Sequence, residues 1–436
     1  MKSAETTRSE KLTPDNMHRR ISPYQNNCYT ESQKIVHKPS AIVIKLDSVT
    51  GLQTSRILAK YGISVIGIAD DPNSFCCKTN SCKQVLTANT SNDELIITLI
   101  RLGKILGGKS ALFPCSDDSV LAVSIHREEL RDWYEFVFPD HKTIDLLMDK
   151  VKLYQYLERT GFSIPPTFFA SNKSDIKEIA NKVTYPCIVK PPRPVQTWYK
   201  YFENKVLKVR NPEELYAICD NCLRATDTLI IQEWIDGKES NIYQYYYYFD
   251  KNYKPIINYT SRKLRQWPIE TGEASLAEEC LIDPVPRESI DIYSRIQYKG
   301  IISLEIKIDE KSGRHFIVEP DVGRPNTSIG LVEASGVPIL YTMYCDALGL
   351  PLPAYIAQKY TGIKWISLHR DLKASIAYYI RGELSFKDWL KSIKGVKTFA
   401  VFSIRDPLPF ILDACELFRT ILKFARRRIS DVFKKM

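Results

Sequence analysis

The feature that most constrains the fold is an alternation of strand and helix patterns that begins near residue 40. AIVIKLD is an apolar run typical of a buried strand, SVTGLQTSRILAKYG is a turn and an amphipathic helix that ends at Gly62, and ISVIGIADD is a second buried strand. The helix pattern SNDELIITLIRLGKILG and the strand pattern SALFPCSDD continue the series. Because strands joined through helices pair in parallel, we expect a Rossmann-like domain at 39–147.

Three polar residues, Ser116, Asp117 and Asp118, directly follow one of these strands. Ligands of parallel sheets gather at the carboxyl ends of the strands, so the three are candidates for substrate contact. An equally good interpretation is that Asp117 or Asp118 caps the next helix.

Composition limits the class of protein. At 436 residues the chain exceeds the usual size of one domain, so we expect two or three packed units. There is no run of 18 or more apolar residues and no apolar region of a secretory signal at the N-terminus, which favours a cytoplasmic protein. Residues 1–38 are polar and show no sustained period, which is typical of a flexible leader.

The positive charge is concentrated at the C-terminus. The last twenty residues contain seven Lys or Arg and one Asp, which supplies +6 of the net charge of +10 and argues against a nucleic-acid partner. In residues 411–436 the apolar residues recur at helical spacing and the basic residues lie elsewhere around the helix. Such a helix suits peripheral contact with an anionic membrane, at its inner face for a cytoplasmic protein. Packing on the body or on a partner is the alternative, and the oligomeric state stays open.

A second unit begins at residue 148. MDKVKLYQYLERTGFSIPPT predicts a helix, and the strand patterns TYPCIVKPP, VLKV and TLIIQEWI surround the helix pattern PEELYAICDNCLRA. SNIYQYYYYFD and PIINYTSRKLRQWP are typical of antiparallel strands. The four tyrosines from Tyr245 to Tyr248 alternate faces in such a strand, and we expect them to pack against the core and the sheet surface.

An acidic hairpin follows. ISLEIKIDE and RHFIVEP flank KSG, and a three-residue loop that ends in a left-handed glycine is a common hairpin turn. If Glu310 pairs with Arg314, then Leu304 faces Pro320 and Ile306 faces Val318 on an apolar side. On the polar side Glu305 lies directly opposite Glu319.

Two opposed carboxylates destabilise a sheet by a few tenths to about 1 kcal/mol, and by more once they are buried. A shared proton or a bridging divalent cation would compensate. Asp321, just past the strand end, adds a third oxygen ligand, which favours Mg²⁺ and the nucleotide phosphates that Mg²⁺ commonly accompanies. The alternative is a register shifted by one residue, with the acids in solvent on opposite faces.

An anionic nucleotide also needs cations. Lys190 ends the apolar run CIVK and is followed by two prolines, Lys150 begins a helix, and Arg324 follows the acidic residues. Each is weak evidence alone, because exposed lysine is usually only solvated.

The order of these motifs resembles that of the ATP-grasp superfamily, and most of all its carboxylate-amine ligase branch, which includes D-aspartate ligase-like enzymes. The resemblance covers about three quarters of the chain, from residue 40 to 350. Its motifs are DK at 149–150, IVKP at 188–191, IIQEWIDG at 230–237, SRKLRQWP at 261–268, SLEIK at 303–307 and VEPDVGRPN at 318–326.

The resemblance implies an α/β fold in which a pre-ATP-grasp domain precedes a two-lobed ATP-grasp domain at 148–355 and a helical appendage at 356–436. Similar enzymes use ATP and Mg²⁺ (or Mn²⁺) to join a small-molecule carboxylate to an amine. The carboxylate attacks the γ-phosphate to give an acyl phosphate and ADP, and the amine then displaces phosphate. An amino acid or a sugar acid of the cell envelope would be a substrate of this kind.

The resemblance also implies roles for individual residues. Lys150 and Lys190 would contact ATP phosphates, and Arg324 would steady the reacting oxyanion. The remaining roles are the adenine hinge (Gln232, Glu233, Ile235), the ribose neighbourhood (Glu239), the Mg²⁺ ligands (Glu305, Glu319, Asp321) and further oxyanion contacts (Arg265, Lys263).

Two departures from the family pattern keep alternatives open. The family usually has Asn where this chain has Asp321, and its phosphate lid is usually glycine-rich, whereas PPRPVQTWYKYFENK has no glycine. Backbone cradling of phosphate would then be poorer, unless Arg193, Trp198 and Lys200 substitute for it through their side chains. A catalytically inactive ATP-binding scaffold and a membrane-docked adaptor are the alternative functions.

Overall fold

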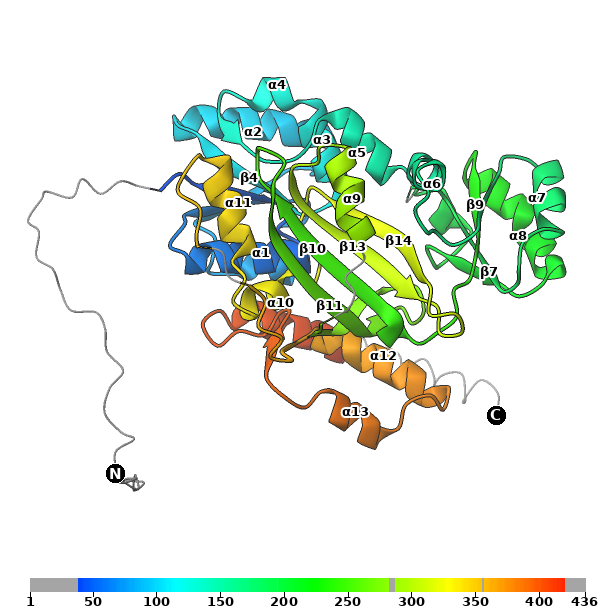
Figure 1. Cartoon of the computed structure of the whole chain (residues 1–436). Coiled ribbons are helices and arrows are strands. Elements are labelled where there is room, and N and C mark those ends of the chain that lie inside the picture. Colours follow the sequence, from blue (N-terminus) through cyan, green and yellow to red (C-terminus); the bar gives the residue numbers. More distant parts are fainter. Residues whose placement is uncertain (1–37, 194, 282–286, 355–356, 420–436) are drawn as a thin grey trace, which may run out of the picture. The chain divides into compact units, whose positions relative to one another are not determined.

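The computed structural model describes residues 38–193, 195–281, 287–354 and 357–419. The described chain is a mixed α/β protein with one parallel sheet and two further sheets (Figure 1). Within these residues, no helix is both long and apolar enough to span a bilayer. The expected leader, except Lys38, and the part of the expected C-terminal helix from 420 onward lie outside the described residues.

The first sheet confirms the parallel arrangement. It has five strands in the order β3-β2-β1-β4-β5, and every neighbouring pair is parallel. Ser48 caps α1 by accepting a hydrogen bond from the Gly51 amide, and Gly107 ends α2 in the left-handed conformation. The elements are β1 (Ala41–Ile44), α1 (Val49–Lys60), β2 (Val65–Ala69), β3 (Gln84–Thr87), α2 (Asp93–Leu106), β4 (Ser110–Pro114), α3 (Asp117–Ile125), α4 (Arg127–Leu130), β5 (Tyr134–Glu135) and α5 (His141–Met148).

A small antiparallel sheet follows, in the order β6-β9-β7-β8. It has its own apolar core, which includes Trp198 from the segment between β7 and β8. The elements are α6 (Lys150–Arg159), β6 (Thr167–Ala170), α7 (Lys173–Ala180), β7 (Cys187–Lys190), β8 (Leu207–Val209), α8 (Pro212–Ala225) and β9 (Leu229–Glu233).

The third sheet has seven strands in the order β14-β13-β10-β11-β12-β15-β16. Tyr245 to Tyr248 lie in β10 and alternate between its two faces as expected, but all four are buried because both faces are covered. The elements are β10 (Ile242–Phe249), β11 (Pro255–Trp267), β12 (Glu273–Glu279), α9 (Arg287–Arg295), β13 (Gly300–Ile308), β14 (His315–Val322), α10 (Ile329–Ala334), α11 (Ile339–Ala347), β15 (Lys364–Ile366), α12 (Leu368–Ile380), α13 (Phe386–Ser392) and β16 (Lys397–Phe399).

The C-terminal segment differs from the expectation of a separate, purely helical appendage. β15 pairs with β12 and β16 pairs with β15, so residues 364–399 extend the large sheet as well as adding α12 and α13. Strands of three residues are too short to show a period in the sequence. A last helix covers 408–419.

The hairpin of β13 and β14 confirms the predicted register only near the site. Leu304 pairs with Pro320 and Glu305 with Glu319, but Ile306 then pairs with Ile317, so the pairs toward the turn are shifted by one. Val318 is the extra residue of a β-bulge. Gly313 in the turn has φ of 67° and takes the predicted left-handed conformation.

Gly300 begins β13, the strand that carries Glu305. At this residue the strand lies very close to the preceding domain. Its φ is 94°, and a Cβ atom would lie 2.0 Å from the carbonyl oxygen of Val137. We expect Gly300→Ala to lower the free energy of unfolding by about 3 kcal/mol or more, since a strained backbone alone costs about 1–3 kcal/mol. Gly313→Ala is the control, because φ is also positive there but no atom lies within 4 Å. Urea denaturation that gives equal losses for the two variants would contradict the close approach.

Candidate active site

The acidic hairpin lines a cavity of about 540 Å³, a volume within the range of small-molecule sites. The small sheet and the seven-stranded sheet both contribute, as do the first residues of α3 and α6. Its lining includes ten of the twelve predicted site residues: Lys150, Lys190, Gln232, Glu233, Ile235, Lys263, Glu305, Glu319, Asp321 and Arg324. Arg265 and Glu239 are not among the lining residues.

The opposed carboxylates Glu305 and Glu319 each pair with a lysine from another element. Lys263 Nζ of β11 lies 2.6 Å from Glu305 Oε2, and Lys150 Nζ at the start of α6 lies 3.2 Å from Glu319 Oε2. The Lys150 ammonium, with help from Lys205 and Lys190, outweighs burial and holds the pKa of Glu319 well below its usual value. Burial disfavours the ammonium of Lys263, but Glu305 outweighs it and raises the lysine pKa. Cations therefore offset the like-charge repulsion that the sequence predicts.

Lys190 lies at the end of β7 with its ammonium buried inside the cavity wall. It donates hydrogen bonds to the hydroxyl of Tyr154 at 3.0 Å and to Oε1 of Gln232 at 3.1 Å. Tyr154 in turn donates to the carbonyl of Val318, the bulged residue next to Glu319. Among the described residues, the hydrogen-bond partners of Lys190 are neutral, and no ion pair is seen for it. Its positive charge is therefore available to an anion.

Arg324 connects the hairpin to the parallel sheet. Its guanidinium donates to Asp321 Oδ1 at 2.6 Å and to Asp117 at the start of α3. Burial raises the pKa of Asp321, and the nearby Asp117 and Glu319 add to this rise against the effect of Arg324. Of the residues after β4, Ser116 is the cap of α3, while Asp117 and Asp118 line the cavity.

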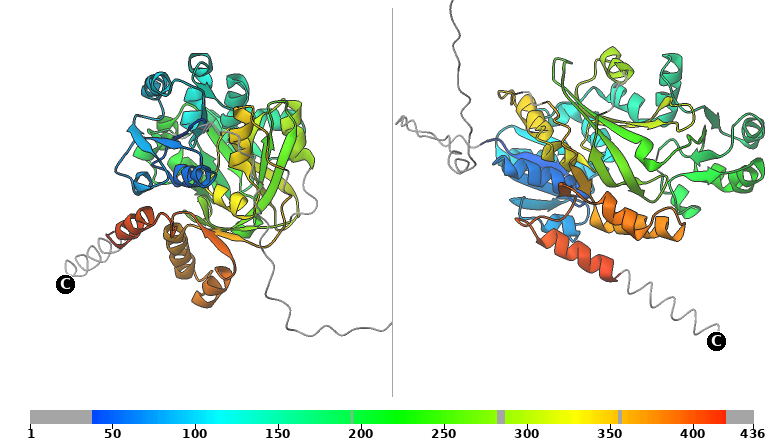
Figure 2. Two further views of the ribbon diagram at one scale, coloured as in Figure 1. Left: turned by 90° about the vertical axis from the view of Figure 1, so that its left-hand side faces the viewer. Right: turned by 60° about the horizontal axis from the view of Figure 1, so that its bottom comes forward.

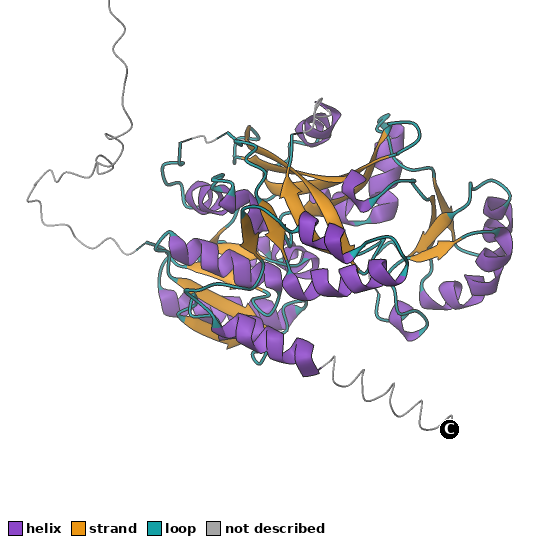
Figure 3. Ribbon diagram, turned by 90° about the horizontal axis from the view of Figure 1, so that it is seen from below, coloured by secondary structure: helices purple, strands orange, loops and turns teal. Residues whose placement is uncertain are grey.

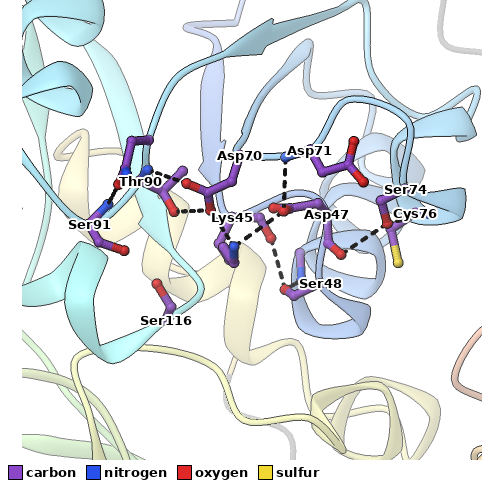
Figure 4. Close-up of polar contacts among 12 residues, drawn as sticks. Lys45, Asp47, Ser48, Asp70, Asp71, Ser74, Cys76, Thr90, Ser91 and Ser116 are labelled. Atoms are coloured by element: carbon purple, nitrogen blue, oxygen red, sulfur yellow. Dashed lines mark hydrogen bonds and ion pairs between the residues drawn. The ribbon is translucent and has the colours of Figure 1, made fainter. Parts of the chain in front are cut away.

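A polar network connects the loops at the carboxyl ends of the parallel strands, near the start of α3 (Figure 4). Lys45 lies between the carboxylates of Asp47 and Asp70, and Asp70 accepts hydrogen bonds from the amide and hydroxyl of Thr90, both at 2.7 Å. Ser91 donates to Asp118 at 3.4 Å. These contacts fix the loops after β1, β2 and β3 next to the α3 residues that reach the cavity.

The structure corrects two predicted roles. Arg265 donates to both carboxylate oxygens of the buried Asp371 at 2.8 and 3.0 Å, and to Ser392 at 2.7 Å, so its guanidinium is directed to α12 and α13 rather than to the cavity. Glu239 accepts hydrogen bonds from the amides of Gln266 and Glu270 and holds the turn after β11. Burial raises the pKa of Glu239.

The glycine-free segment between β7 and β8 is held by its own side chains. Trp198 is fully buried and donates to the carbonyl of Asn204 at 2.8 Å, and Arg193 pairs with Asp145 at 2.6 Å. Lys200 is exposed and does not line the cavity. Lys205 does line it, and its charge contributes to the low pKa of Glu319.

Lys205 is the cavity cation that the sequence reasoning missed. Its signal in the sequence was weak, because it lies in a polar loop where a solvated lysine is the ordinary expectation. Among the described residues, no hydrogen bond or ion pair is seen for its ammonium.

Oxygen donors suitable for Mg²⁺ are present, but they are not gathered into a metal centre. Within the described ranges, no group of three or more His, Cys, Asp or Glu lies close enough to hold a metal ion. Glu305, Glu319 and Asp321 instead each have a basic partner. The chemistry of the donors fits a hard divalent cation, provided that the lysine partners turn to another anion when the ion binds.

The sequence was compared with family models and with known proteins. No family model matches the chain. It is 22% identical over 261 residues to D-aspartate ligase of Enterococcus faecium, covering 56% of this chain and 61% of that protein. It is 25% identical over 207 residues to D-alanine–D-alanine ligase B of Pseudomonas putida, covering 44% and 58%. The chain thus spans about three fifths of the length of these curated relatives.

Solved structures share the fold. The biotin carboxylase domain of 2-oxoglutarate carboxylase from Hydrogenobacter thermophilus, in complex with MgADP, ADP and bicarbonate, has a TM-score of 0.57 at 17% identity, over 72% of this chain and 70% of that chain. N5-carboxyaminoimidazole synthetase from Staphylococcus aureus, complexed with ADP, has a TM-score of 0.57 at 14% identity, over 72% and 78%. The chain therefore has the fold of the ATP-grasp enzymes and resembles ligases of that superfamily, as the order of its motifs predicted.

Proposed function

We propose that the protein is an ATP- and Mg²⁺-dependent ligase that activates a small-molecule carboxylate and joins it to an amine. The observation that carries this proposal is that Glu305, Glu319, Lys150, Lys190 and Lys263 line one cavity, to which the small sheet and the seven-stranded sheet both contribute. A cavity that alternates acidic and basic groups suits a metal-bound polyphosphate, whose negative charge needs cations and whose metal needs carboxylates.

The chain's own residues would act as follows. Lys190, which is buried and has no carboxylate partner among the described residues, would bind a phosphate oxygen, while Gln232 holds its ammonium in place. Glu305, Glu319 and Asp321 would hold Mg²⁺ if Lys150 and Lys263, which pair with Glu319 and Glu305 in the structure, turned toward the nucleotide. A bound Mg²⁺ would neutralise charge on the phosphoryl oxygens. Glu233 and Ile235, which line the cavity, would contact the adenine.

In the reaction, a carboxylate oxygen of the acid attacks the γ-phosphorus, and the bond between that phosphorus and the β,γ-bridging oxygen breaks to release ADP. The amine nitrogen then attacks the acyl carbon, phosphate leaves, and the nitrogen loses a proton as the amide forms. Arg324, which pairs with Asp117 and Asp321, would stabilise the oxyanion of either step. The acid and the amine are of the small-molecule class, for which amino acids and sugar acids are the candidates to test.

The proposal extends to the parts of the chain. Residues 39–147 act as the Rossmann-like pre-ATP-grasp domain and 148–355 as the ATP-grasp domain, with 356–436 appended to them. The enzyme works in the cytoplasm, at the inner face of the membrane, with residues 411–436 in peripheral contact. An inactive ATP-binding scaffold is the second candidate, and the packed, glycine-free segment around Trp198 is the observation that favours it.

Release of ADP and phosphate from Mg-ATP, measured across pooled amino acids and sugar acids, separates the two candidates. A ligase releases both products only when an acid and an amine are present. Nucleotide binding without acid-dependent release supports the scaffold instead.

Glu319→Gln keeps the size of the side chain and removes its charge. We expect turnover to fall by roughly 100-fold or more, because Mg²⁺ and Lys150 both lose their partner at the reacting phosphate. Circular dichroism and thermal unfolding serve as checks of the fold. Asp321→Asn is the comparison variant and retains turnover, because Asn is the usual residue at this position in the resembling family. Normal turnover in Glu319→Gln would remove Glu319 from the site.

Lys205→Ala removes the one lysine of the glycine-free segment that lines the cavity. We expect the Kd for Mg-ATP to rise by about tenfold, since a hydrogen bond to a charged group contributes about 1.5–3 kcal/mol. Calorimetric titration with adenosine should show no change, because the contact is to phosphate. Lys200→Ala is the matched control from the same segment and should bind ATP normally. Equal affinities for the two variants would exclude Lys205 from phosphate binding.

Arg265→Met tests the corrected role of Arg265. Because it leaves the buried carboxylate of Asp371 without its ion-pair partner, we expect the free energy of unfolding to fall by about 3–5 kcal/mol. The Kd for ATP, measured well below the melting temperature, should stay that of the wild type. A loss of ATP affinity without a loss of stability would return Arg265 to the active site.

A further inference from the structure

Exposed apolar side chains are concentrated in the C-terminal part of the described chain. Of the 23 large apolar side chains that are exposed in the described residues, twelve lie in the 51 residues from Leu368 to Phe418. Single exposed apolar residues are normal, but a concentration of this kind marks a contact surface. The twelve are Leu368, Ile376, Tyr379, Ile380, Phe386, Leu390, Val396, Phe402, Ile404, Leu408, Ile411 and Phe418.

On α12 and α13 these residues form stripes along one side of each helix. Ile376, Tyr379 and Ile380 of α12 are spaced by three and four residues, whereas Asp371 and Ala374 of the same helix are buried. Phe386 and Leu390 of α13 are likewise one turn apart. The apolar stripes therefore face away from the core.

The last described helix, 408–419, also has its large apolar residues on its exposed side. Leu408, Ile411 and Phe418, with the exposed Cys415, follow one another at spacings of three and four residues. The polar Asp413 is buried on the inner side, where it bonds to Nδ1 of His369 at 2.7 Å. An ordinary surface helix has the opposite arrangement, with its apolar residues inside.

The charged residues of this segment differ in burial: several acidic residues are buried, and most of the exposed ones are basic. Three of its acidic residues are buried and paired: Asp371 with Arg265, Asp406 with Arg56 and Asp413 with His369. The exposed charged residues of 376–419 are six basic and three acidic: Arg381, Lys387, Lys391, Lys394, Arg405, Arg419, Glu383, Asp388 and Glu416. The sequence from 420 to 436 adds six Lys or Arg and one Asp.

The three helices lie on the same side of the large sheet. Figure 3 shows the molecule from this side, and the two views of Figure 2 place the orange and red C-terminal helices there together. We call the exposed apolar and basic residues of α12, α13, the 396–405 segment and 408–419 the C-terminal face.

We propose that the C-terminal face docks on an anionic lipid surface, with its apolar side chains in the interface and its basic side chains among the headgroups. Apolar area and basic charge are the two terms that determine binding of this kind. A second copy of the chain fits less well, because a symmetric pairing would bring the basic residues of the two copies together. This proposal deepens the peripheral membrane contact proposed above for residues 411–436, and it does not depend on the ligase reaction.

The test is sedimentation of the full chain with vesicles of phosphatidylcholine, alone or mixed with phosphatidylglycerol. We expect the wild type to sediment with the mixed vesicles, less so at high salt, and to bind phosphatidylcholine alone weakly. In Ile380→Ser/Phe386→Ser/Ile411→Ser, whose side chains are exposed and make little core contact, the partition coefficient should fall at least tenfold. Ile105→Ser/Ile125→Ser/Tyr253→Ser replaces three exposed apolar residues elsewhere and should bind like the wild type.

Three results would overturn the proposal. The wild type could stay in the supernatant with the mixed vesicles, or the C-terminal variant could bind as well as the control variant. In the third, light scattering would find a wild-type dimer that the C-terminal variant alone dissociates, which would make the face a contact between copies.

Discussion

The opposition of Glu305 and Glu319 across β13 and β14 is the constraint on which the site depends. Two carboxylates at this separation are tolerated only if cations reach both of them, and the cations come from distant elements: Lys263 from β11 and Lys150 from α6. The ion pair between Glu319 and Lys150 therefore joins the large sheet to the unit that begins at α6. The same arrangement prepares the site for a metal-bound polyphosphate, because each lysine can exchange its glutamate for a phosphate while the metal takes the carboxylates.

The sequence was sufficient to predict the strand register of the hairpin at the opposed glutamates. The apolar and polar faces set the register at Leu304 and Glu305, and the structure has the same pairs. The bulge at Val318 could not be predicted, because it depends on contacts from outside the hairpin. Tyr154 donates to the carbonyl of Val318, and the amide of Ile317 donates to the carbonyl of Ser163. Strand periodicity contains no information about such partners.

Most charged residues of the motifs line the cavity, but a distant partner takes the side chain of Arg265 away from it. Arg265 lies in the same motif as Lys263, but Asp371, 106 positions further along the chain, accepts its guanidinium in a buried pair. Lys205 shows the reverse case, because a lysine in a polar loop has no pattern that distinguishes it, and only the fold places it over the cavity. The parallel sheet was predictable from periodicity, whereas the three-residue strands β15 and β16 were not.

The central claim is that the carboxylate of one substrate attacks the γ-phosphorus of ATP, and transfer of ¹⁸O tests it most directly. The protein would be incubated with Mg-ATP, an amine pool and amino acids or sugar acids labelled with ¹⁸O in the carboxyl group, and the released phosphate analysed by mass spectrometry. The account predicts one labelled oxygen in the phosphate, because the oxygen that bonds to phosphorus leaves with it when the amide forms. Unlabelled phosphate released together with ADP would show transfer to water and contradict the account.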